Sequence, residues 1–315
     1  MLENIYKIKD FLAGMDKVLI IIHQRPDGDA CGSALAMSSY LKSLGKQTSI
    51  FSADPPPSYF YFLPSISEIT NDKNIFQQNW QAVIFLDCGD IKNSRLPIEL
   101  SGHLTIINID HHFTNTGYGD FNLVDASASS TCEVVYNFLK KVDFEIDKNM
   151  ATCLLTGIMT DTGGFSNSAT SRDSLDIASE LVQSGGKINY LYGHLTKNKS
   201  MAGLRLWGLV MSRLKFNQRY NLVYTYVKDQ DFRDYNISEE EADGLTDFFN
   251  VIDGVDLVVF LRLRQGETKV SLRTTKNNID VSRLAQLFGG GGHKKASGFT
   301  VPWQITEKDG KLVIE

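Results

Sequence analysis

The first half of the chain alternates short apolar runs with stretches that have helical spacing. Each apolar run has the length of a strand and ends abruptly in polar residues. Near-continuous apolar strands that alternate with helices are typical of a mostly parallel sheet that is covered on both faces. The sequence therefore predicts an α/β fold for this half. The strands are expected at 17–22, 48–51, 82–86 and 104–109, and the helices near 30–44, 129–141, 148–160 and 171–184.

The second half has a different pattern, in which apolar and polar residues alternate with a period of two. This alternation occurs in 220–227, 256–264 and 268–273. The residues Gln-Gly-Glu at 265–267 fit a tight turn that joins two antiparallel strands. The pattern predicts a smaller α+β fold. Helical signals are expected near 187–213, 243–250 and 281–288.

Length and composition fit this interpretation. At roughly 150 residues per domain, 315 residues correspond to about two domains. We expect one domain at 1–190, a helical linker at 191–210 and a second domain at 211–315. The chain has 32 Lys and Arg against 37 Asp and Glu, so its formal net charge is −5. Proteins that coat long duplex nucleic acid need excess positive charge, so that class is excluded, whereas a small phosphate-bearing substrate is not.

The sequence also predicts a cytoplasmic protein without membrane association. Its longest aliphatic run, residues 18–22, is far shorter than the ~20 residues that a spanning helix needs. The charged residues near the start fit an amphipathic helix rather than a signal peptide. The four cysteines form no C-x-x-C pair, which favours reduced, buried thiols.

Polar side chains gather where the predicted apolar strands end, which is where open α/β sheets bind their ligands. Carboxylate and imidazole ligands suit Mn²⁺, Mg²⁺, Fe²⁺ or Zn²⁺. The candidates exceed what one ion needs, and two cations would relieve the repulsion among them and clamp a phosphoryl group. For any single cluster the alternative is an Asp that caps a helix. The clusters contain His23, Asp27 and Asp29; Asp87 and Asp90; Asp110, His111 and His112; and Asp161 at the end of a predicted helix.

Basic and glycine-rich features in the second half could bind phosphate. The four glycines at 289–292 precede His293 and Lys294, and converging backbone N–H groups in such a run can bind an anion. The alternative for the glycines is a flexible turn. Arg262 and Arg264 lie two apart on a predicted strand and so share one face, with Arg273 on the next strand. Arginine suits bidentate phosphate recognition, and the alternative is a solvated basic face.

Taken together, these motifs resemble those of the DHH phosphoesterase superfamily. The pattern H-x-x-x-D-x-D at 23–29, then Asp87, the run Asp-His-His at 110–112 and Asp161 match its four motifs in order. The segment 289–298 resembles the signature of the associated DHHA1 domain. The size of the chain is similar to the branch of oligoribonucleases and 3′-phosphoadenosine 5′-phosphate (PAP) phosphatases called nanoRNases.

The resemblance implies a role for each of these residues. One metal ion would bind His23, Asp27 and Asp87, and the other Asp29, Asp87, His111 and Asp161, so that Asp87 bridges the two. Asp110 would orient an imidazole, and His112 would face the substrate phosphate. The implied catalytic residues are Asp87, Asp110, His111 and His112. The implied substrate contacts are His112, Arg262, Arg264, Arg273, Gly291, Gly292, His293, Lys294 and Ser297.

The implied activity is that of a two-metal phosphodiesterase and phosphatase. The cations would be Mn²⁺, with Mg²⁺ or Co²⁺ as alternatives. Such an enzyme would hydrolyse short oligoribonucleotides to mononucleotides and PAP to AMP, and it would not bind long duplexes. A homodimer is compatible with the resemblance. The alternatives are a cyclic di-AMP or linear dinucleotide phosphodiesterase, an exopolyphosphatase or pyrophosphatase, and a non-catalytic nucleotide-binding regulator.

Overall fold

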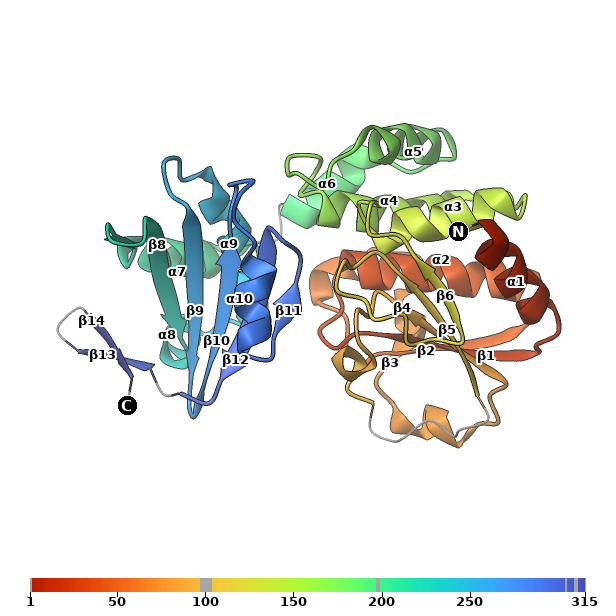
Figure 1. Cartoon of the computed structure of the whole chain (residues 1–315), viewed down its shortest axis with the longest axis horizontal. Coiled ribbons are helices and arrows are strands. Elements are labelled where there is room, and N and C mark those ends of the chain that lie inside the picture. The colour runs from red at the N-terminus through yellow and green to blue at the C-terminus, as the bar shows by residue number, and fades with distance from the viewer. Residues whose placement is uncertain (1, 97–103, 197–198, 304, 309–310, 315) are drawn as a thin grey trace. The chain divides into compact units, whose positions relative to one another are not determined.

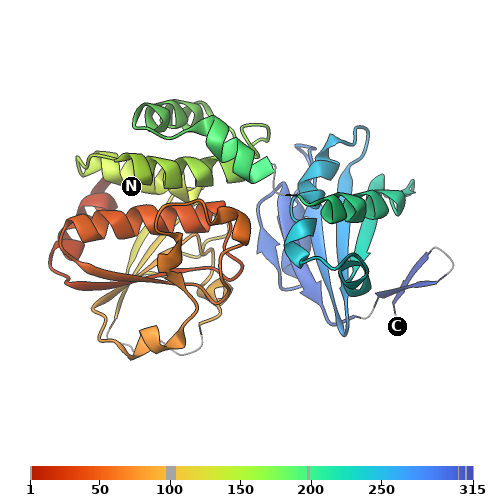
Figure 2. The same ribbon diagram turned by 180° about the vertical axis from the view of Figure 1, so that it is seen from behind.

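The computed structural model describes residues 2–96, 104–196, 199–303, 305–308 and 311–314. The chain divides into two compact units, Met1–Asn198 and Lys199–Glu315 (Figures 1 and 2). The division lies within the segment expected as a linker, but both helices of that segment belong to a core. Leu191 of α6 (Ile188–Thr196) is buried in the first unit, and Leu206 of α7 (Met201–Ser212) is buried in the second.

The first unit is built on a parallel sheet, as predicted. Its six described strands have the order β3-β2-β1-β4-β5-β6, and all neighbours run parallel. The central strands β1, β4 and β5 consist almost entirely of buried residues because both of their faces are covered. The short edge strands β3 and β6 were not predicted from the sequence. The strands are β1 (Lys17–Ile22), β2 (Gln47–Phe51), β3 (Ile69–Thr70), β4 (Ala82–Leu86), β5 (Thr105–Asp110) and β6 (Phe121–Val124).

The two faces of this sheet are covered in different ways. The long helices α2, α3 and α4 lie on one face, and α5 packs on α4 farther out (Figure 1). Loops and the short 3₁₀ helices η3 (Lys73–Gln77) and η4 (Ile91–Ser94) cover the other face, where Phe51, Trp80 and Phe85 are buried. The α-helices of this unit that precede α6 are α1 (Leu2–Ala13), α2 (Gly28–Ser43), α3 (Thr131–Lys141), α4 (Lys148–Asp161) and α5 (Arg172–Gln183). Two further 3₁₀ helices are η1 (Ser58–Phe60) and η2 (Ile66–Glu68).

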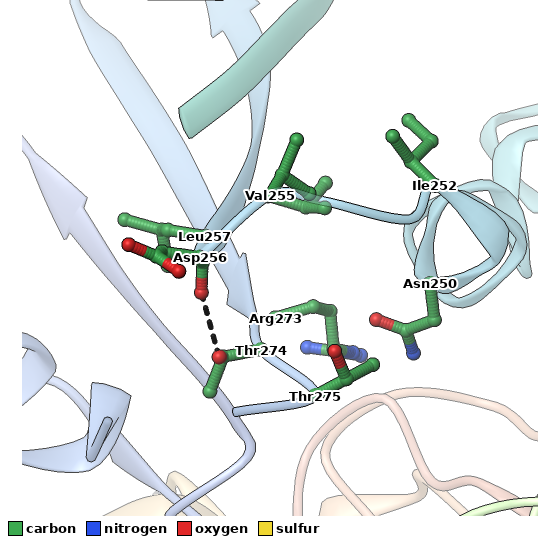
Figure 3. A pocket seen from close by; sticks show the side chains of 9 residues that line it. Asn250, Ile252, Val255, Asp256, Leu257, Arg273, Thr274 and Thr275 are labelled. Carbon is green, nitrogen blue, oxygen red and sulfur yellow. Dashed lines mark hydrogen bonds between the residues drawn. The ribbon is translucent and has the colours of Figure 1, made fainter. Parts of the chain in front are cut away.

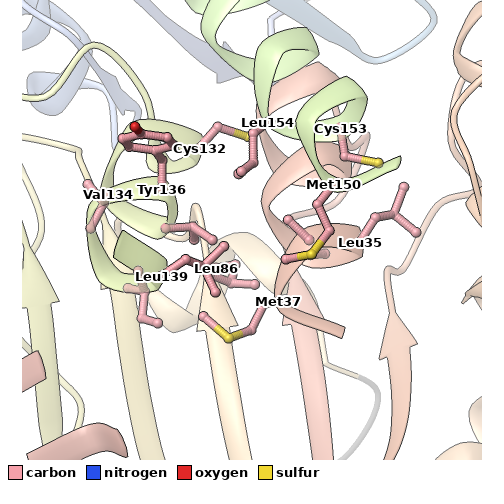
Figure 4. Packing of buried hydrophobic residues seen from close by; sticks show 14 of the residues in the cluster. Leu35, Met37, Leu86, Cys132, Val134, Tyr136, Leu139, Met150, Cys153 and Leu154 are labelled. Carbon is pink, nitrogen blue, oxygen red and sulfur yellow. The ribbon is translucent and has the colours of Figure 1, made fainter. Parts of the chain in front are cut away.

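Helices α2, α3 and α4 pack closely over the sheet (Figure 4). A Cβ atom on Gly32 would lie 2.3 Å from the carbonyl oxygen of Cys153, and one on Gly157 would lie 2.3 Å from Sγ of Cys132. Such distances are far inside van der Waals contact, so only glycine allows this approach. All four cysteines are buried and free, in agreement with the sequence prediction.

The second unit contains a mixed sheet, in agreement with the predicted α+β pattern. Its six described strands have the order β11-β12-β10-β9-β8-β7, and Gly266, with a φ of 80°, lies in the turn of the β9–β10 hairpin. The main strands are β7 (Lys215–Asn217), β8 (Leu222–Lys228), β9 (Leu257–Arg264), β10 (Glu267–Arg273), β11 (Gly291–Gly292) and β12 (Ala296–Val301). A separate hairpin consists of β13 (Ile305–Lys308) and β14 (Lys311–Ile314).

Alternation along these strands creates two small cores. Val258 and Phe260 of β9 face a core that includes residues of α7, and Leu261 and Leu272 face a second core that includes Val281 of α10. The helix predicted near 243–250 is shorter than expected, because a single α-helical turn passes directly into a 3₁₀ turn. The helical segments are α8 (Asp229–Tyr235), η5 (Glu239–Ala242), α9 (Leu245–Phe248), η6 (Phe249–Val251) and α10 (Val281–Leu287). Among the described residues, no helix combines the length and apolar character of a membrane span.

Candidate metal centre

The parallel sheet brings the predicted acidic and histidine clusters to one edge. Strands β1, β4 and β5 are neighbours, and their carboxyl ends lead directly into His23, Asp87 and Asp110. The first turn of α2 adds Asp29, and Asp161 is the last residue of α4. Clusters that are far apart in the sequence therefore meet because parallel strands end at the same side of a sheet.

Among the described residues, Asp87 belongs to three groups of donor atoms: two consist of predicted metal ligands, and the third joins Asp87 to Asp110 and His112. His23, Asp27 and Asp87 each offer one donor atom within 4.8 Å of the others, and so do Asp29, Asp87 and His111. In the first group, Nε2 of His23 lies 3.4 Å from Oδ2 of Asp87 and 3.8 Å from Oδ1 of Asp27. The two groups involve different oxygens of Asp87: Oδ2 faces His23, and Oδ1 faces His111.

The second group surrounds the buried imidazole of His111. Its Nε2 atom lies 3.2 Å from Oδ2 of Asp161, 3.6 Å from Oδ1 of Asp87 and 3.7 Å from Oδ2 of Asp29. Ligand bonds of about 2.0–2.2 Å leave donor atoms about 3–4 Å apart around one ion. The spacing of both groups therefore fits divalent cations.

Charge crowding gives a second indication of cation binding. Burial, together with the carboxylates of Asp87 and Asp161, raises the pKa of Asp29 well above its usual range. Burial, partly offset by a hydrogen bond from His111, raises the pKa of Asp161 to about 6. Negative charges that burial forces together favour a bound cation, which would restore the ionised form of each carboxylate.

Asp29 is held in place by the start of α3. Its carboxylate accepts hydrogen bonds from the backbone N–H groups of Thr131 at 2.6 Å and Cys132 at 2.8 Å. A helix N-terminus stabilises negative charge, so this contact fixes a fully buried carboxylate. Ser130 caps the helix, and Glu133 accepts hydrogen bonds from both the backbone and the hydroxyl of Ser129.

Asp87 is held by both its backbone and its side chain. Its φ of 58° lies in the left-handed region, which costs a non-glycine residue roughly 1–2 kcal/mol. Its backbone N–H donates to the carbonyl oxygen of Ile109 at 3.2 Å, and the hydroxyl of Thr131 donates to Oδ1 at 3.0 Å. Backbone strain of this kind persists only where the surroundings enforce it.

Asp110 is paired with a neighbouring imidazole. Its Oδ1 lies 2.8 Å from Nδ1 of His112, and its Oδ2 accepts a hydrogen bond of 2.6 Å from the side-chain amide of Asn115. Burial would raise the pKa of Asp110, but the hydrogen bond with His112 lowers it to about 2. An ionised carboxylate in this position fixes the orientation of the imidazole ring.

In the second unit, the structure places two of the predicted phosphate contacts in ion pairs. Arg262 and Arg264 share one face of β9, as their spacing predicted. Arg262 contacts Oδ1 of Asp243 at 3.1 Å and Oε2 of Glu239 at 3.5 Å. Arg264 pairs with Glu239 and also contacts Oε1 of Glu267 at 3.3 Å. These acidic partners were not expected from the sequence.

The glycine-rich segment forms ordered backbone structure. Gly291 and Gly292 constitute β11, which pairs with Gly298 and Ser297 of β12. A tight turn follows, in which His293 and Ala296 exchange backbone hydrogen bonds of 2.7 and 3.1 Å. The hydroxyl of Ser297 donates to the carbonyl oxygen of His293 at 2.7 Å, and Lys294 lies exposed at the turn.

The predicted contact Arg273 is the last residue of β10, where it pairs with Ala296 at the end of this turn. It lines a small pocket together with Asn250, Thr274 and Thr275 (Figure 3). The residues predicted to contact substrate in this unit therefore occupy three local settings: an ion-pair network, a turn after a two-residue strand, and a pocket wall.

Comparison with known proteins identifies the family. A model of the DHH family N-terminal domain matches residues 17–158, and a model of the DHHA1 domain matches residues 219–310. A protein of Thermus thermophilus named bifunctional oligoribonuclease and PAP phosphatase NrnA is 32% identical over 284 residues, which cover 90% of this chain and 84% of that protein. The chain belongs to the DHH family. The family and fold class inferred from the motifs are thus confirmed.

Other relatives of this DHH-family chain cover it almost entirely. The protein of the same name from Bacillus subtilis is 26% identical and covers 91% of this chain and 90% of its own length. The crystal structure of an exopolyphosphatase-related protein from Bacteroides fragilis superposes with a TM-score of 0.86 and 27% identity over 95% of this chain and 91% of that one. RecJ from Thermus thermophilus, with a TM-score of 0.55 and 11% identity, covers 95% of this chain and 51% of its own and shares the fold alone.

The sequence motifs did not reveal the residues that hold the carboxylates of the candidate metal centre in place. Thr131 and Cys132 hold Asp29, and Asn115 holds Asp110. The S-x-x-E pattern at 130–133 was a visible signal for a helix start. No local pattern links that helix start to Asp29, because the contact spans about 100 residues and depends on how α3 packs against α2.

Proposed function

We propose that this DHH-family chain is a metal-dependent phosphoesterase that degrades short oligoribonucleotides and removes a phosphate from PAP. The observation that carries the proposal is the convergence of two donor groups on Asp87. The relatives from Thermus thermophilus and Bacillus subtilis, both named as bifunctional oligoribonucleases and PAP phosphatases, support the substrate class. Four free, buried thiols accord with a cytoplasmic location.

The proposed centre binds two divalent cations, with Mn²⁺ as the first candidate and Mg²⁺ or Co²⁺ as alternatives. Bound cations would supply Lewis-acid chemistry, which activates water as a nucleophile and offsets the negative charge of phosphate. The carboxylate and imidazole donor set is compatible with these ions. The ligands of the first ion are His23, Asp27 and Asp87, and those of the second are Asp29, Asp87, His111 and Asp161.

The protein's own groups position the substrate in this proposal. Asp110 fixes the ring of His112 through Nδ1, so the opposite edge of the ring can donate a hydrogen bond to a phosphate oxygen. In the DHHA1 domain we assign phosphate binding to Arg273, and we leave Arg262 and Arg264 to their ion pairs. The remaining proposed contacts are Gly291, Gly292, His293, Lys294 and Ser297.

The test is a substrate panel with the purified chain. A labelled ribodinucleotide and PAP are incubated with Mn²⁺, with Mg²⁺, and with a chelator, and products are separated by chromatography. We expect mononucleotides and AMP only when a divalent cation is present. Turnover of neither compound in any metal would overturn the proposed substrate class.

Polyphosphate is the second candidate substrate. The similar structure from Bacteroides fragilis carries the name of an exopolyphosphatase-related protein, which is the specific reason to include it. Polyphosphate, pyrophosphate, cyclic di-AMP and linear di-AMP therefore complete the panel. The substrate with the highest kcat/KM decides among them, and we expect the ribodinucleotide to exceed polyphosphate.

A further inference from the structure

A small pocket in the DHHA1 domain holds a polar atom with unused bonding capacity. Oδ1 of Asn250 is buried and has no hydrogen-bond partner among the described residues of the chain. Asn250 lies in η6, directly after α9, and its side chain lines the pocket with Arg273 and Thr275 (Figure 3). A buried carbonyl oxygen without a donor destabilises the folded chain, so a group that donates to it would be bound favourably.

The chemistry of the pocket wall restricts what can enter. In Figure 3 the amide oxygen of Asn250 is turned toward the side where Arg273 and Thr275 lie. An amide oxygen only accepts hydrogen bonds, and a guanidinium group only donates them. A group that bridges the two must therefore donate to Asn250 and accept from Arg273. A hydroxyl group does both, whereas a phosphate oxygen lacks the proton that Asn250 needs.

The size and position of the pocket agree with a hydroxyl group. The space has room for about one water molecule or one hydroxyl group. Thr275 is exposed, so the pocket can be entered from solvent. Ile252 and Val255 form an apolar part of the wall, which suits the carbon atoms that carry such a hydroxyl.

Arg273 supplies the cationic group of the pocket wall. Its Nη1 donates a hydrogen bond of 3.1 Å to the carbonyl oxygen of Leu272, and its side chain lines the pocket beside Asn250. A guanidinium has five donors, so Arg273 can bind a phosphate oxygen and a neighbouring hydroxyl at once. In ribonucleotides a hydroxyl lies next to a phosphate at the 2′ and 3′ carbons of the sugar.

We propose that Asn250 is a specificity-determining residue that accepts a hydrogen bond from a ribose 2′-hydroxyl of the substrate, with Arg273 as its partner. This inference rests on the proposed function, because it assumes that the substrate is a short oligonucleotide. The 2′-hydroxyl is both a donor and an acceptor and is the group by which proteins distinguish RNA from DNA. A site built to pair with a hydroxyl discriminates against the analogue that lacks it.

The experiment compares three dinucleotides that differ only at the 2′ position: ribo, deoxyribo and 2′-O-methyl. The 2′-O-methyl compound keeps the acceptor oxygen but loses the donor. We measure KM and kcat for the full chain and for Asn250→Leu and Asn250→Asp. Asn250→Leu removes the acceptor at similar volume, and Asn250→Asp keeps an acceptor oxygen.

We expect the wild-type chain to prefer the ribodinucleotide over both analogues, and Asn250→Leu to lower that preference by about 10-fold. The change should come from a higher KM for the ribodinucleotide, with kcat and the deoxyribodinucleotide values within about twofold of wild type. Asn250→Asp should retain the preference. If the pocket holds only a structural water, Asn250→Leu will change the melting temperature but leave the preference intact, and the proposal is then wrong.

A binding measurement separates this inference from the proposed function. Equilibrium binding of the ribo- and deoxyribodinucleotide to the intact chain is measured by calorimetry with a chelator present, so that no turnover is needed. Tighter binding of the ribodinucleotide that disappears in Asn250→Leu supports the role of Asn250 even if another compound proves to be the preferred substrate. Equal binding of the two dinucleotides to wild type would refute it, whatever the panel of substrates shows.

Discussion

The two units of this DHH-family chain treat charged side chains in opposite ways. In Met1–Asn198, the buried carboxylates of Asp29 and Asp87 and the partly buried carboxylate of Asp161 are crowded around the imidazole of His111. In Lys199–Glu315, the guanidinium groups of Arg262 and Arg264 already contact carboxylates of the same unit. Crowded like charges indicate a site that needs a ligand, whereas paired opposite charges are satisfied by the fold itself.

The difference follows from what each arrangement costs when nothing is bound. Like charges that are buried together destabilise the folded chain unless they bind protons or cations. Partly exposed ion pairs contribute only about 0–1 kcal/mol, and they are stable without any partner molecule. A buried cluster of like charges is therefore evidence for a binding site, whereas a partly exposed ion pair needs no explanation beyond the fold.

The largest expected effect comes from removing the carboxylate that both donor groups share. We expect Asp87→Ala to lower kcat by roughly 10³-fold, because it removes a proposed ligand of both ions and the electrostatic stabilisation they give. We expect Mn²⁺ to raise the melting temperature of the wild-type chain and not that of the variant, since a ligand stabilises only a state that binds it. Activity assays and thermal melts with and without Mn²⁺ measure both effects.

Asp90 provides the matched control for Asp87. It lies three residues farther along the same motif, and its carboxylate caps η4 by accepting a hydrogen bond from the backbone of Lys92 at 2.8 Å. Asn caps helices as well as Asp does, so Asp90→Asn should keep wild-type activity and the Mn²⁺-dependent increase in melting temperature. If Asp90→Asn loses as much activity as Asp87→Ala, the shared carboxylate of Asp87 is not the decisive ligand.

A second prediction concerns the packing that brings Asp29 to the centre. A Cβ atom on Gly157 would lie 2.7 Å from Oδ1 of Asp29, in addition to its clash with Cys132. We expect Gly157→Ala to destabilise the first unit by about 1–3 kcal/mol, the usual cost of overpacking a core. It should also weaken Mn²⁺ binding, because the clash displaces a proposed ligand. Calorimetric unfolding and metal titration measure the two effects separately.

Gly193 is the control for this substitution. It lies within α6 of the same unit, and a Cβ atom there would meet nothing within 4 Å. Gly193→Ala should be neutral or stabilising by up to about 1 kcal/mol, because alanine favours the helix. If both substitutions destabilise the unit equally, the loss of stability in Gly157→Ala has a cause other than the clash with Asp29.

The sequence predicted that the acidic and histidine clusters meet, but it did not predict the acidic partners of Arg262 and Arg264, and geometry explains the difference. Residues that follow buried parallel strands must meet at one edge of the sheet, so strand positions alone place His23, Asp87 and Asp110 together. Period-two spacing likewise places Arg262 and Arg264 on one face. It says nothing of what lies over that face, and Glu239 and Asp243 arrive there from a 3₁₀ turn whose position no local pattern shows.

The dependence on tertiary packing also explains why the sequence did not indicate Asn250 as a site residue. Its residue type and its neighbours in the sequence carry no motif, and the helix predicted over 243–250 would have made it one more helical position. The change from α9 to the 3₁₀ turn η6 sets where its amide points, and the pocket forms only because the end of β10 supplies Arg273 beside it. Such a site depends on tertiary packing and is visible only in the folded chain.

The smallest expected effect tests the opposite side of the comparison, in the DHHA1 domain. Arg262→Met keeps the apolar stem but removes the contacts with Glu239 and Asp243, so we expect a loss of about 1 kcal/mol in stability with kcat/KM for the ribodinucleotide within about threefold of wild type. Arg273→Met should instead raise the KM for the ribodinucleotide at least about 10-fold, because it removes a proposed phosphate contact. Calorimetry and steady-state kinetics on the two variants measure this contrast. A KM that rises as much in Arg262→Met as in Arg273→Met would mean that substrate displaces the carboxylates, and the ion pairs on β9 would then belong to the binding surface.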